Sequence, residues 1–155
     1  NKYEHLKYSN AFEDLIDAFV PQKGGGASFR RKFSKTFSSK YEFYIYTFFI
    51  GFHLKRKFEL DDKGKTFWQF SDWPHHQEYK NIIFMFLLNE NLDDFYQFEN
   101  MDEEEKISFT NYIFKEIEKY ANGGMEYIKE KKNNEPEFFS NPYWPKKLLE
   151  ECTTN

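Results

Sequence analysis

The sequence predicts a mainly α-helical fold: a single-domain helical bundle with a small β-hairpin and an extended C-terminal tail. Three observations support this fold class. Apolar side chains recur at helical spacing, two capping boxes precede such stretches, and aromatic residues make up 22% of the composition. The 20 Phe and 11 Tyr side chains replace many aliphatic residues, and 155 residues suffice to bury one core.

Residues 1–22 are expected to form an N-terminal helix, because apolar positions share one helical face and Pro21 ends the pattern. A flexible, Gly-rich connection follows at residues 23–28. In residues 29–37 a Phe at every fourth position predicts another helical face, with basic residues opposite. The residues that set the two faces are Phe12, Leu15, Ile16 and Phe19, then Phe29, Phe33 and Phe37.

A capping box, Ser39-x-x-Glu42, opens the next helix, which we expect to run to about Leu54. Its side chains are apolar almost all round, a pattern typical of a buried central helix. Gly51 lies within it and indicates a close crossing by another helix.

A small β-hairpin is predicted near residues 57–70, with the Asp/Gly cluster at residues 61–64 as its turn. Trp73–Pro74 begins the following helix, because proline suits the first helical turn. This helix is expected to end near Asn89. Its apolar face consists of Tyr79, Ile82, Ile83, Phe86 and Leu87.

A second capping box, Asp102-x-x-Glu105, opens a helix that we expect to bury Phe109, Ile113, Ile117 and Tyr120. The sequence Asn122–Gly123–Gly124 predicts the end of this helix, with a further short helix at residues 125–132. Residues 133–155 contain three prolines and the pair Tyr143–Trp144, so we expect a Pro/aromatic tail that packs as an extended strap.

No residue pattern predicts a catalytic, metal or cofactor site. His75, His76 and Glu78 do not supply the three or four convergent ligands that zinc needs, and Cys152 is the only cysteine. The glycines at residues 24–26 lack the Lys-Ser/Thr pair of a nucleotide-binding loop, and no Gly-x-Ser-x-Gly motif occurs. The sequence therefore favours a protein without enzymatic activity and without a cofactor.

The charge distribution is the one feature that points to a partner. Nine of the 22 Lys and Arg residues lie between Lys23 and Lys57 with a single acid, Glu42, so this segment carries +8 in a chain of net charge −4. The candidate nucleic-acid-binding residues are Arg30, Arg31, Lys32, Lys35, Lys40, Lys55, Arg56 and Lys57.

Cations in such number could contact several phosphates of a nucleic acid and give strongly salt-dependent binding. Two other interpretations stay open: the basic face docks an acidic protein partner, or it pairs with the chain's own acids. The overall acidity, with a pI of about 5.6, counts against a free-standing DNA-binding protein of high affinity.

Four short stretches of the chain carry a resemblance to a known family: Phe48–Phe52, Lys57–Leu60, Gly64–Phe67 and Tyr120–Ile128. In these stretches the chain resembles the small E protein of bacterial DNA phosphorothioation (Dnd) systems. The resemblance covers just over half of the chain and implies a small, mostly helical, oligomeric accessory protein that binds the DNA backbone. It implies backbone contacts for Lys55, Arg56 and Lys57. The chain departs from the family in its longer ends, its acidic insertion at residues 93–105 and its Pro/Trp tail.

We expect a cytoplasmic, bacterial protein with no membrane association. The longest apolar run is about half the length of a membrane-spanning helix, and the first residues do not form a secretory signal. A bacterial source is inferred from the abundance of Phe, Tyr, Asn and Lys, which suggests an AT-rich genome.

Overall fold

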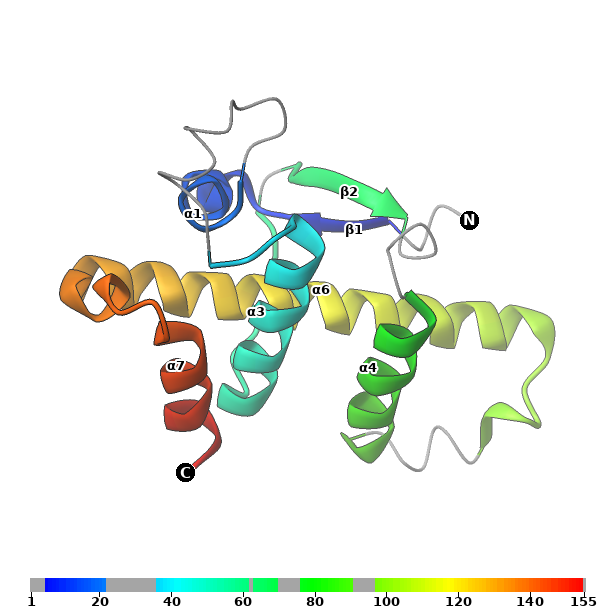
Figure 1. The fold of residues 1–155 in the computed structure, drawn as a ribbon. Helices are drawn as coiled ribbons and strands as arrows, with labels where there is room; N and C mark the ends of the chain where they lie inside the picture. Colours follow the sequence, from blue (N-terminus) through cyan, green and yellow to red (C-terminus); the bar gives the residue numbers. More distant parts are fainter. Residues whose placement is uncertain (1–4, 22–35, 62, 70–75, 91–96, 155) are drawn as a thin grey trace. The chain divides into compact units, whose positions relative to one another are not determined.

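The computed structural model describes residues 5–21, 36–61, 63–69, 76–90 and 97–154 (Figure 1). It confirms a mainly α-helical fold with a small two-stranded antiparallel sheet. The elements are, in chain order, β1 (His5–Tyr8), η2 (Asn10–Phe12), α1 (Glu13–Phe19), α3 (Lys40–Leu54), β2 (Lys65–Gln69), α4 (His76–Glu90), α6 (Glu103–Asn134), η4 (Pro136–Ser140) and α7 (Trp144–Thr153).

The chain divides into two compact units. The acidic unit comprises Asn1–Lys7 and Thr66–Glu118, and the basic unit comprises Tyr8–Lys65 and Lys119–Asn155. The acidic unit contains 13 Asp and Glu against 5 Lys and Arg, a net charge of −8. The basic unit contains 13 acids against 17 bases, a net charge of +4. The charge imbalance of the sequence therefore follows the division of the fold.

Helix α3 has the boundaries that the sequence predicts. The Ser39 hydroxyl accepts a hydrogen bond from the Glu42 N–H at 3.3 Å, and the Glu42 carboxylate accepts one from the Ser38 N–H at 3.1 Å. The helix ends at Leu54, after which Lys55 adopts a left-handed conformation with φ of 54°. Its buried residues, which form the centre of the basic unit, are Phe43, Tyr44, Ile45, Thr47, Phe48, Ile50 and Gly51.

Glycines bring the backbone of α3 into contact with that of α6. A Cβ atom added to Gly51 would lie 2.0 Å from the carbonyl oxygen of Tyr120, and one added to Gly124 would lie 1.9 Å from that of Thr47. A Cβ at Gly123 would lie 2.1 Å from the Arg56 carbonyl oxygen. The predicted close crossing at Gly51 is therefore confirmed.

The prediction that Gly123 and Gly124 end a helix is wrong, because α6 continues unbroken to Asn134. Glycine costs about 1 kcal/mol relative to alanine inside a helix. At these two positions any larger residue would collide with α3 or with the segment that follows it. The contact with α3 stabilises a helix that the local sequence alone would interrupt.

The predicted strand near residues 57–70 is present as β2, but its predicted partner is wrong. β2 pairs with β1 at the start of the chain. The N–H of Phe58 instead donates to the Lys119 carbonyl of α6 at 3.0 Å, so residues 56–60 lie along α6 and form no strand. The N-terminal helix predicted for residues 1–22 is shorter in the structure. Of its described residues, only those of α1, Glu13–Phe19, are α-helical, and β1 and η2 precede them.

The prediction of an extended C-terminal strap is also wrong. Residues 136–140 form η4 and residues 144–153 form α7, whose first turn accommodates Pro145. The Trp144 ring lies 4.8 Å from the Phe19 ring and 4.7 Å from the Phe139 ring. The Tyr46 hydroxyl of α3 donates to the Pro145 carbonyl at 2.8 Å, which fixes α7 against α3 (Figure 1).

Within the acidic unit, α4 packs against the first half of α6. Ile83 and Leu87 are buried, as predicted, and the Phe84 ring lies 6.1 Å from the Phe114 ring. Ile82 does not join this face, because its side chain is 44% exposed. The predicted N-cap at Asp102 is confirmed, because its carboxylate accepts a hydrogen bond from the Glu105 N–H at 2.8 Å. The predicted start at Trp73–Pro74 lies outside the described residues.

Replacing Gly124 with alanine tests the backbone crossing. Helix propensity alone would make this change stabilising by about 1 kcal/mol. Because the added methyl group would collide with the Thr47 carbonyl, we expect the free energy of unfolding to fall by about 2–3 kcal/mol instead. Urea denaturation measures the difference. The exposed Ser108→Ala in the same helix should change stability by less than about 0.5 kcal/mol. A more stable Gly124→Ala protein would contradict the crossing.

Candidate nucleic-acid interface

The structure locates four of the eight predicted contact residues. Arg30, Arg31, Lys32 and Lys35 lie outside the described residues. Lys40 is the first residue of α3, and residues 55–57 follow its last. A helix of 15 residues is roughly 20 Å long, so α3 holds Lys40 and Lys55 at its opposite ends. The described cations therefore form two separate sites and not one continuous patch.

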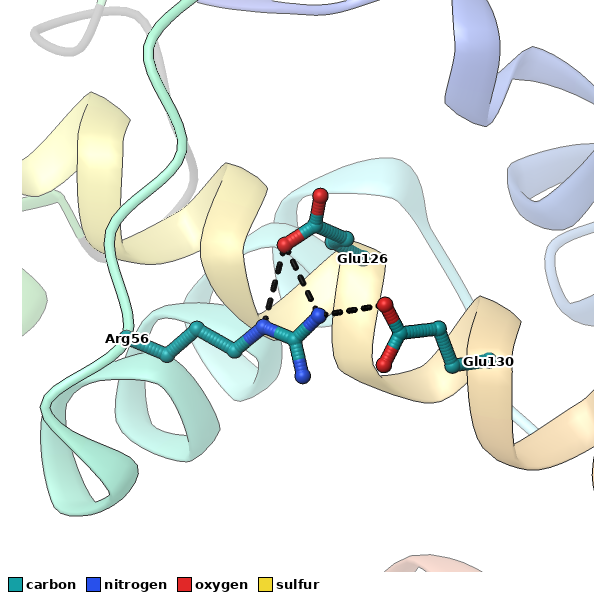
Figure 2. Close-up of polar contacts among 3 residues, drawn as sticks. All are labelled: Arg56, Glu126 and Glu130. Carbon is teal, nitrogen blue, oxygen red and sulfur yellow. Dashed lines mark hydrogen bonds and ion pairs between the residues drawn. The ribbon is translucent and has the colours of Figure 1, made fainter.

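The Arg56 guanidinium is bound to two carboxylates of α6 (Figure 2). Its Nε lies 3.0 Å and its Nη2 lies 2.8 Å from Oε1 of Glu126. The same Nη2 lies 2.7 Å from Oε1 of Glu130, and the guanidinium carbon lies 5.7 Å from the centre of the Tyr127 ring. Sequence reasoning missed this role, although Glu126 and Glu130 are four residues apart and share a helix face.

The contacts of Arg56 make it an anchor for the residues on either side of it. Its pKa is raised above the ordinary arginine value by the hydrogen bond to Glu130, and further by Glu126, against the opposing effect of burial. The Arg56 N–H also donates to the Gly51 carbonyl at 2.8 Å. Backbone and side chain are thus both fixed, and a phosphate would have to displace two carboxylates to reach the guanidinium.

Lys55 and Lys57, on either side of this anchor, are exposed. The Lys57 Nζ lies 5.2 Å from the centre of the Tyr120 ring, within reach of a cation–π interaction. Both lysines follow the C-terminal end of α3, where the helix dipole favours positive charge. Lys119 lies next to this segment, because its carbonyl accepts from Phe58, and its Nζ lies 3.3 Å from Glu59.

Lys40 occupies a different environment at the start of α3. It is exposed, and its Nζ lies 5.9 Å from the centre of the Tyr8 ring. A cation in the first turn gains nothing from the helix dipole, which favours negative charge there. Its position is therefore not explained by the stability of α3.

A second group of charges, at the end of the basic unit, is occupied by internal contacts. The Lys131 Nζ lies 3.0 Å from Glu135 and 3.5 Å from Glu151, and 4.5 Å from the centre of the Phe138 ring.

Burial, and to a lesser extent the charge of Glu151, raises the pKa of the Cys152 thiol. A raised thiol pKa lowers the thiolate fraction, which is the opposite of what a nucleophilic cysteine requires.

Among the described residues, no group of three or more His, Cys, Asp or Glu side chains is placed to hold a metal ion. Within the same part of the chain, no helix combines the length and the hydrophobicity that a membrane span requires.

Comparisons of the chain with protein-family models, with curated proteins and with solved structures give no match.

A double-mutant cycle tests the anchoring of Arg56. We expect Arg56→Met and Glu126→Gln each to lower the free energy of unfolding, with a coupling of about 0.5–1 kcal/mol, because the pair is only partly exposed. Glu130 is more exposed, so its coupling with Arg56 should be smaller. Chemical denaturation of the four proteins gives the coupling. Lys55→Met is the matched control, and an equal coupling of Lys55 with Glu126 would contradict the specific anchor.

The environment of Cys152 predicts a pH dependence of stability. Because its folded pKa is raised, the thiol stabilises the fold below its unfolded pKa of about 8.5, and this contribution is lost as the pH rises. The free energy of unfolding should therefore fall faster above that pH in the wild type than in Cys152→Ala, by up to about 1.4 kcal/mol per pH unit. Parallel denaturation curves at each pH measure this. Identical slopes for the two proteins would show that burial does not perturb the thiol.

Proposed function

We propose that the chain is a non-catalytic accessory protein whose basic unit contacts the phosphates of a nucleic acid. The observation that carries the proposal is the exposure of Lys55 and Lys57 on either side of the anchored Arg56. An anchored backbone presents both cations without a large loss of conformational entropy on binding. Arg56 then positions the two contact residues and does not itself contact a phosphate.

The dimensions of α3 are compatible with a bound duplex. Each strand of DNA presents a phosphate about every 3.4 Å along the axis, so roughly 20 Å of helix spans about six phosphates. Lys40 at one end of α3 and Lys55 and Lys57 at the other could therefore meet the same nucleic acid. The sequence Arg30–Arg31–Lys32 and Lys35 would add further cations of the same unit.

The resemblance to the small E protein of DNA phosphorothioation systems supports the same proposal. That family binds the DNA backbone without an established catalytic site. We therefore place the chain in a bacterial DNA-modification or phage-defence system, where an accessory protein of this kind would act beside an enzyme supplied by another chain.

Fluorescence anisotropy with a labelled duplex across a salt series tests the proposal. We expect the logarithm of affinity to fall steeply with the logarithm of salt concentration. Replacing Lys55 and Lys57 by alanine should lower the magnitude of this slope by about two units, one for each lost phosphate contact. The same change should weaken binding at least tenfold at low salt. Lys146→Ala/Lys147→Ala, which removes two exposed lysines from α7 of the same unit, should leave both nearly unchanged.

Three results would overturn the proposal: no binding at low salt, equal losses in the two double variants, or equal binding of polyglutamate. Equal binding of polyglutamate would favour the alternative function, a protein–protein adaptor whose basic face docks an acidic partner. Lysine ammonium groups bind carboxylates and phosphates alike, so only the comparison of the two polyanions separates these functions.

A further inference from the structure

The outer face of α4 carries large apolar side chains that are exposed in the part of the chain that the structure describes. Ile82 is 44% and Met85 is 69% exposed. Together with Glu78 and Asn89, which are also exposed, they follow one line along the helix at spacings of four, three and four residues. The opposite face, through Ile83 and Leu87, is buried within the acidic unit.

The sequence of α4 indicates that the exposed face belongs in an interface. Residues 82–88 are seven consecutive apolar residues, so the helix is apolar all round over two turns. Such a helix is normally buried on every side. Among the described residues, however, Ile82 and Met85 of α4 are exposed, and Ile107 and Tyr112, on α6 of the same unit, are also 49% and 43% exposed. Exposed apolar side chains in this number mark a contact surface for another molecule.

The negative charge of the acidic unit indicates which kind of partner would bind the exposed face of α4. Its net charge is −8, and exposed carboxylates lie at both ends of the apolar line, on Glu78 and Glu90. Further exposed acids, Glu103, Glu104 and Glu105, begin α6. Two copies that met through this face would bring like charges together, whereas a basic partner would neutralise them.

We propose that the outer face of α4 docks a basic amphipathic helix of a partner protein. The apolar face of that helix packs on Ile82 and Met85, and its flanking Lys or Arg residues pair with the carboxylates around them. Ile82 and Met85 lie three residues apart on one face of α4, and an incoming helix with apolar residues at i, i+3 and i+4 presents a matching apolar face to them. This surface belongs to the acidic unit, whereas the lysines of the proposed nucleic-acid interface belong to the basic unit.

A titration with two model peptides tests the proposal on the full chain. Both peptides are roughly five-turn helices with leucines at helical spacing, and the remaining positions are lysine in one and glutamate in the other. We expect the lysine peptide to bind at least tenfold more tightly than the glutamate peptide, with an affinity that falls as salt is added. The double variant Ile82→Ser/Met85→Ser should bind the lysine peptide about tenfold or more weakly than the wild type does.

Tyr143→Ser is the matched control, because Tyr143 is an equally exposed apolar residue in the other unit, and it should not change peptide binding. Circular dichroism checks that the variants remain folded. Equal affinity for the two peptides, no binding of the lysine peptide, or an equal effect of the control would overturn the proposal. Sedimentation gives a further test. A dimer that dissociates in Ile82→Ser/Met85→Ser would identify a second copy as the occupant and overturn the basic partner.

Discussion

The backbone contact between α3 and α6 is the constraint on which the rest of the basic unit depends. Gly51 and Gly124 allow the two helices to touch, and Gly123 admits the segment that leaves α3. This segment then lies along α6, where Phe58 donates to the Lys119 carbonyl and Arg56 reaches Glu126 and Glu130. The exposed positions of Lys55 and Lys57 are the last consequence of the same contact. The position of the two exposed lysines therefore depends first on glycines, which carry no charge, and then on the contacts of Arg56.

Local signals in the sequence were sufficient for α3, because both its cap and its apolar composition act within a few residues. They were insufficient where a distant group decides the conformation. Gly123 and Gly124 stop a helix in isolation, but here they are the residues that let a second backbone approach. The strand β1 and the residue that follows it likewise contact α6: the N–H groups of Lys7 and Ser9 donate to the side chains of Glu118 and Asn122. Neither partner could be identified from spacing along the chain.

For the charged residues, too, the sequence predicts some features, and others depend on contacts with distant residues. Composition located the basic segment correctly, because a net charge needs no knowledge of the fold. It could not distinguish Arg56, which is bound to two carboxylates, from Lys55 and Lys57, which are exposed. Arginine binds two carboxylates in a fixed plane, whereas lysine is a mobile point charge. This chemical difference suits the arginine to an internal anchor and the lysines to an exposed contact, so the order Lys–Arg–Lys has a physical reason that a count of charges conceals.

The distribution of charge between the units links the two proposed surfaces. A nucleic acid repels a unit of net charge −8 and attracts one of +4, so phosphates would be contacted by the basic unit alone. The acidic unit, in which the described residues leave Ile82 and Met85 exposed, would in turn attract a protein with basic residues. Proteins that themselves act on nucleic acids often carry such residues, and the acidic unit would compete with phosphate for them. On both proposals, the sign of the charge therefore directs the nucleic acid to the basic unit and a basic protein to the acidic unit.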